Sequence, residues 1–205
     1  MKHDPRPDTA LRLSLSEISA LSARATRGSG RNWGAAEEAA QATCWLARAW
    51  LDWAGALLQV LEASPENVDC TLRAGIFLAD AAALPDAVAA QKHRVTSPCF
   101  LLPFAARMAS QTGQRIRLDW AETQVVLAPD AAPMLAGAVQ IAGPAEVTIT
   151  PDVTDTPPST DWPRHHRGGV TAVQYARLTQ FMLAFTVPTS ASSLAGAGAQ
   201  GHDND

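Results

Sequence analysis

The stretch Arg27-Gly28-Ser29-Gly30-Arg31-Asn32-Trp33-Gly34 separates two segments whose apolar residues have the spacing of amphipathic helices. In the first segment, Ser14 and Glu17 have the spacing of a capping box, which predicts that a helix begins there. Gly28 lies where a left-handed C-cap would end that helix. The second helix is expected to begin near residues 34–35. The stretch is therefore predicted to be a helix stop, a bend and a helix start.

The second segment carries an apolar stripe that continues as far as Leu61, and Pro65 ends it. The pattern fits one long helix, or two helices with a break near Asp52 and Gly55. The segment and the stretch before it also hold a dense group of tryptophans, at positions 33, 45, 50 and 53. These indole rings are expected to pack in the core, or alternatively to form a surface that docks onto another subunit.

The rest of the chain predicts a mixed body. Alternation of polar and apolar residues predicts a β-hairpin, and helical spacing predicts two further helices. The expected elements are a strand at 71–78, a helix at 98–113, a hairpin at 115–127, a strand at 139–141 or a helix at 131–142, a strand at 146–150, and a helix at 170–187.

The predicted fold class is α+β, with a helical N-terminal part, a small antiparallel sheet, a C-terminal helix and a flexible glycine-rich tail. We expect a single domain, in which a helical front spans about 12–65, a mixed body spans about 66–188 and the tail spans 189–205.

Composition narrows the classes of function. The 205 residues carry a formal net charge of -4, and lysine occurs only at Lys2 and Lys92, so nucleic-acid binding is not expected. No apolar run reaches the length of a membrane span, so we expect no membrane partner. The three cysteines are far apart, and an odd, scattered set argues against a disulfide framework. A cytoplasmic protein is the resulting prediction.

The opening stretch is also the first candidate site. Gly28 and Gly30 do not make a dinucleotide fingerprint, because a helix precedes them and Trp33 replaces the third glycine. A glycine-rich backbone with Arg27 and Arg31 could instead hold an anion such as a carboxylate or a phosphate. The alternative is a plain helix–turn–helix connection.

A second candidate lies before the last helix. Arg164, His165 and His166 stand next to one another, and adjacent imidazole and guanidinium groups could bind a metal or clamp a carboxylate. However, no further ligand stands at metal-binding spacing, and a solvated loop explains the segment equally well. We therefore expect no metal and no cofactor, and no catalytic residue is assigned.

Several segments carry a resemblance to a known family: residues 14–30, 33–40, 45–48, 98–107 and 187–205. On these segments, which include the motif Arg-Gly-Ser-Gly-Arg-Asn-Trp-Gly-Ala-Ala-Glu-Glu-Ala, the chain resembles a family of bacterial proteins defined only as a domain of unknown function. The resemblance looks full-length. Its pattern implies a glycine-containing helix stop after Arg48, where this chain has Ala49-Trp50-Leu51. A fainter similarity is to the helical N-terminal segment of malate/lactate dehydrogenase-like enzymes.

The resemblance also suggests a role for the C-terminal tail. A glycine-rich end followed by Asp203 and Asp205 is expected to fold over a pocket, where the acidic residues would meet a cation or an arginine.

Two functions from different classes remain open. One is a small enzyme or accessory subunit that acts on an anionic metabolite of the hydroxy-acid or amino-acid type, in a pocket at Arg27, Arg31 and Trp33. The other is a non-catalytic assembly protein, or a homo-oligomer, which docks through its Trp-rich helical front. The second predicts an exposed apolar patch over residues 45–61 and no pocket.

Overall fold

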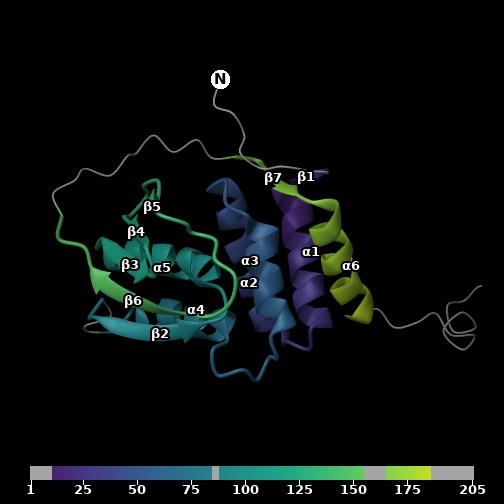
Figure 1. Cartoon of the computed structure of the whole chain (residues 1–205), viewed down its shortest axis with the longest axis horizontal. Helices are drawn as coiled ribbons and strands as arrows, with labels where there is room; N and C mark the ends of the chain where they lie inside the picture. The colour runs from purple at the N-terminus through teal and green to yellow at the C-terminus, as the bar shows by residue number, and fades with distance from the viewer. Residues whose placement is uncertain (1–10, 85–87, 155–164, 186–205) are drawn as a thin grey trace, which may run out of the picture.

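The computed structural model describes residues 11–84, 88–154 and 165–185. Figure 1 shows two halves that lie side by side. One half holds α1, α2, α3 and α6, which span Leu15–Gly28, Trp33–Arg48, Trp53–Glu62 and Ala172–Phe185. The other half holds α4 and α5, which span Thr71–Ala81 and Pro98–Thr112, next to a five-stranded sheet. The predicted α+β class is confirmed, while the tail lies outside the described residues.

The sheet is antiparallel and has the strand order β2-β6-β3-β4-β5. Its strands in chain order are Gln91–Val95, Ile116–Trp120, Thr123–Leu127, Met134–Ala136 and Ala145–Pro151. In β3 the side chains of Ile116, Leu118 and Trp120 are buried, and the intervening residues lie on the other face. This alternation is the pattern that predicted the hairpin, which is confirmed as β3 and β4.

A two-stranded ribbon lies across one end of the helical half, at the top of Figure 1. Its strands are β1 (Leu11–Ser14) and β7 (Arg167–Val170), which pair antiparallel. The ribbon joins the front of the described chain to the segment before α6. In addition, α6 packs on α1 and α3, although the predicted division placed it with the mixed body.

Helix α5 connects its half of the molecule to the helical half. It packs against α2 and α3 on one side and against β3 and β4 on the other. Fully buried side chains from these helices meet there, among them Leu46, Trp53, Leu57, Phe100 and Leu101. This continuous core fixes the distance between α2 and α5, the two helices that form the cleft described below.

The start of α1 confirms the predicted capping box. The backbone N–H of Glu17 donates to Ser14 Oγ at 3.3 Å, and the backbone N–H of Ser14 donates to Glu17 Oε2 at 2.7 Å. These hydrogen bonds to the carboxylate lower the pKa of Glu17.

Of the two alternatives for the second helical segment, the structure has two helices with a break, since α2 ends at Arg48 and α3 begins at Trp53. The side chain of Asp52 caps α3 by accepting from the Gly55 N–H at 2.9 Å. Trp50 lies in the stretch after Arg48 where a glycine-containing helix stop was expected, and it adopts the left-handed φ of 61°. The helix stop is therefore kept without the glycine.

Two expected strands are wrong. Residues 71–78 form the first part of α4, because Leu72, Gly75, Leu78 and Ala79 recur at helical spacing and face the core. Residues 131–142 form neither a helix nor a strand at 139–141; the edge strand β5 begins at Met134, directly after Pro133. Proline disfavours a helix interior and is tolerated beside an edge strand.

The tryptophan-rich segment is mostly internal. Trp53, Leu57 and Leu61 are buried, and Trp45 and Trp50 are half-buried. The exposed apolar patch predicted over residues 45–61 is therefore absent.

Candidate functional site

The opening stretch forms a tight joint between α1 and α2. The expectation of a left-handed C-cap at Gly28 is wrong: Gly28 is the last residue of α1, and Gly30 takes the left-handed φ of 89°. Gly28 is required for a different reason, because a Cβ at this position would overlap the carbonyl oxygen of Phe181 in α6. Asn32 then caps α2 by accepting from the Ala35 N–H at 2.8 Å.

Arg31 is buried within the joint, with 5% of its surface exposed. Its Nη2 donates to the carbonyl oxygens of Val60 at 2.6 Å and Ala63 at 3.0 Å, and its Nη1 donates to Ser29 Oγ at 2.7 Å. The two carbonyls lie at the C-terminal end of α3, where a cation is favourable. Burial lowers the pKa of this guanidinium, and Cys70 opposes the shift. Arg31 thus ties the joint to α3.

Arg27 has structural partners as well. Its Nη1 donates to the carbonyl of Arg31, and its guanidinium lies 4.8 Å from the Trp33 ring centre and 5.1 Å from that of Phe185. Trp33 and Phe185 meet edge to face at 5.6 Å, and Trp33 is 59% exposed. Binding of an anion by these residues stays a prediction, in competition with the contacts that they already make.

The second predicted site is only partly described. His165 stacks on Trp50 with ring centres 4.0 Å apart, His166 is exposed, and Arg164 lies outside the described residues. Within the described ranges, no three His, Cys, Asp or Glu side chains are grouped as a metal site would require. Asp203 and Asp205 also lie outside the described residues, so their predicted contact with a cation is untested.

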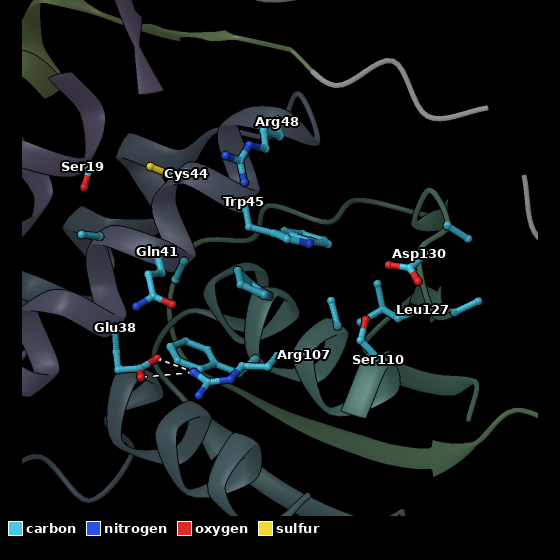
Figure 2. Close-up of a pocket in the computed structure, with 17 residues that line it drawn as sticks. Ser19, Glu38, Gln41, Cys44, Trp45, Arg48, Arg107, Ser110, Leu127 and Asp130 are labelled. Carbon is cyan, nitrogen blue, oxygen red and sulfur yellow. Dashed lines mark hydrogen bonds and ion pairs between the residues drawn. The ribbon is translucent and has the colours of Figure 1, made fainter. Parts of the chain in front are cut away.

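A cleft of about 540 Å³ opens between α2, α5 and the residues that follow β4. Its size is typical of small-molecule sites. Helix α2 supplies Glu38, Gln41, Trp45 and Arg48, which follow one another at intervals of three or four and therefore share one helix face. Figure 2 shows these side chains along one wall of the cleft.

The opposite wall comes from α5 and the end of β4. Helix α5 contributes Phe104, Arg107 and Ser110, and Leu127 and Asp130 follow from β4 and the loop after it. The apolar rings and side chains of this wall, together with Trp45, give the cleft an apolar surface beside its charged groups.

One ion pair spans the cleft from wall to wall. Arg107 Nη1 donates to Glu38 Oε1 at 3.1 Å and to Oε2 at 3.0 Å, as the dashed lines in Figure 2 show. The Arg107 side chain is 42% exposed. Within the described residues, Nε and Nη2 of Arg107 make no hydrogen bond. That edge of the guanidinium can therefore receive a planar carboxylate.

Two further charges face the cleft from opposite sides of Trp45. Arg48 ends α2, and Asp130 lies on the loop after β4 with a left-handed φ of 53°. Figure 2 shows Arg48 beside the Trp45 indole and the Asp130 carboxylate across the cavity from it. Among the described residues, neither Arg48 nor Asp130 has a hydrogen-bond or ion-pair partner.

The thiol at the edge of the cleft is turned toward α1. Cys44 Sγ donates to the carbonyl of Leu15 at 3.3 Å, and burial raises the pKa of this thiol. Cys44 is therefore held as a neutral thiol, which is the opposite of what an activated nucleophile needs.

Residues 13–93 match the family model described as a protein of unknown function (DUF3726). The resemblance to a family of unknown function is confirmed over this part of the chain, which includes the joint and the α2 wall of the cleft. No curated protein and no solved structure matches the chain. No helix of the described residues is both long enough and apolar enough to span a membrane.

The cleft is not among the sites predicted from the sequence. A signal for its α2 wall was present, since polar and aromatic residues recur at helical intervals from Glu38 to Arg48. Nothing in the sequence pairs that face with Arg107 or Asp130, because the pairing depends on how α2 and α5 pack.

Proposed function

We propose that this protein binds a small organic acid in the cleft between α2 and α5. The observation that carries the proposal is the presence of Arg48, Arg107 and Trp45 on the walls of one cavity. The sequence also predicted an anionic ligand, but at Arg27, Arg31 and Trp33; we propose the cleft as its binding site instead.

The groups of the cleft are suited to specific tasks. The open edge of Arg107 can receive a carboxylate in a two-pronged hydrogen bond. The half-buried Trp45 offers aromatic surface to an apolar body of the ligand. Gln41 and Ser110 can donate to or accept from a hydroxyl or amino group. We propose a binding or accessory role, in a cytoplasmic setting that fits three cysteines without disulfides.

A titration with phenylacetate tests the proposal, because this molecule is a simple aromatic carboxylate. Calorimetry and thermal shift are run on the wild type, on Arg48→Gln and Arg107→Gln, and on the control Arg24→Gln, which removes an exposed arginine outside the cleft. Saturable binding that weakens in at least one of the two cleft variants and persists in the control supports the proposal. Equal affinity in all four proteins would contradict it.

The docking alternative can be measured in the same preparation. Its predicted surface over residues 45–61 is buried or half-buried, but Trp33 remains exposed at the end of the helical half. A pull-down with wild type and Trp33→Ala would favour docking if a partner were lost with the indole while no carboxylate bound the cleft.

A further inference from the structure

We infer that the ligand of the cleft is a zwitterion, an amino acid or short peptide with an apolar side chain, rather than a hydroxy acid or a phosphate ester. The inference rests on the proposed function and concerns only the chemical class of the ligand. It follows from the balance of charges on the walls.

The charged lining of the cleft is balanced. Two guanidinium groups, of Arg48 and Arg107, face two carboxylates, of Glu38 and Asp130. A phosphate ester carries about two negative charges and would meet repulsion from both carboxylates. A zwitterion brings no net charge and matches a lining that has none.

Of the four charged side chains, two form an ion pair with each other and two do not. Glu38 accepts from Arg107 Nη1 across the cleft at 3.1 and 3.0 Å and neutralises part of its charge, so Arg107 attracts a ligand carboxylate less strongly than an unpaired arginine would. Arg48 and Asp130 have no such partner among the described residues, and they lie on opposite walls with the Trp45 indole between them in Figure 2. A ligand that carries a carboxylate and an ammonium group offers an opposite charge to each of them.

The loop geometry keeps the carboxylate of Asp130 at the cleft. Asp130 adopts φ 53°, between Pro129 and the buried Ala131. Aspartate tolerates this conformation better than most residues other than glycine and asparagine. The Ala131 N–H donates to the Ala128 carbonyl at 3.4 Å, which closes the turn beneath it.

The apolar part of the ligand would lie on the indole of Trp45. The cleft, at about 540 Å³, has room for more than one residue. The probes therefore include both a single amino acid and a dipeptide. We place the ligand carboxylate toward Arg48 and the ammonium group toward Asp130.

The test is a calorimetric titration with four compounds that differ by one charge. L-Phenylalanine and L-phenylalanyl-L-alanine carry both charges, N-acetyl-L-phenylalanine lacks the ammonium group, and L-phenylalaninamide lacks the carboxylate. We expect at least one of the two zwitterions to bind about tenfold more tightly than either single-charge compound. Inorganic phosphate is expected not to bind.

Two variants assign the charges. Asp130→Asn should weaken the zwitterion about tenfold and leave N-acetyl-L-phenylalanine unchanged, whereas Arg48→Gln should weaken both. Glu122→Gln, which removes an exposed carboxylate from the β3–β4 turn, is the matched control. Equal affinities for the zwitterion and its N-acetyl form, with no effect of Asp130→Asn, would overturn the inference and leave the cleft as an acid site. Failure of every organic acid, phenylacetate included, would overturn the proposed function as well.

Discussion

Replacing Arg31 with alanine should destabilise the protein, because the side chain connects the joint to the end of α3. Three hydrogen bonds would be lost, to Ser29 Oγ and to the carbonyls of Val60 and Ala63. Each hydrogen bond to a charged group contributes ~1.5–3 kcal/mol, and the cost of burying the guanidinium offsets part of the sum. We expect the free energy of unfolding to fall by about 3 kcal/mol, which in a chain of this size lowers Tm by roughly 6–12 °C.

The measurement is urea unfolding followed by tryptophan fluorescence and circular dichroism. Arg24→Ala is the matched control, since this arginine is exposed on the same helix, and its effect should stay within about 0.5 kcal/mol. An Arg31→Ala protein as stable as the control, but unable to bind phenylacetate, would refute the structural role and return the ligand site to the joint.

Three further predictions concern other parts of the fold. Gly28→Ala should lower the free energy of unfolding by ~3 kcal/mol, because the added Cβ would overlap the Phe181 carbonyl of α6. Gly34→Ala is the control, since a Cβ at that position has room, and its stability should not fall. Thermal unfolding compares the two variants. Glu17→Gln should destabilise the protein at neutral pH. Because the pKa of Glu17 is lowered in the folded state, the difference from wild type should disappear as pH falls through that pKa, and equal urea midpoints at neutral pH would contradict this. Arg115→Ala should lower the free energy of unfolding by about 3–5 kcal/mol, because the fully buried carboxylate of Asp152 lies 2.6 Å from Arg115 Nη2 and would lose this cation. Urea unfolding measures the change, and a decrease below about 1 kcal/mol would contradict the prediction.

The local parts of the fold were predictable because their causes are local. The capping box at Ser14 needs only two residues three positions apart, and the β3–β4 hairpin needs only period-two alternation. The break before Asp52 was an open alternative that the side-chain cap decides.

The parts that failed depend on partners far away in the chain. The ribbon of β1 and β7 joins residues about 155 positions apart, and no local pattern announces it. Gly28 looked like a helix stop, but its role is set by α6, which crosses it from the other end of the chain. Arg31 looked free to hold an anion because the carbonyls that bind it belong to α3.

The α2–α5 cleft is the central claim, and amide chemical shifts of ¹⁵N-labelled protein test it most directly. Titration with phenylacetate should move the amides of Gln41 to Arg48, of Arg107 and Ser110, and of residues 127, 128, 130 and 131, with one common saturation curve. The amides of residues 27–33 should stay in place. Saturable shifts confined to 27–33, or no saturable shift at all, would contradict the account.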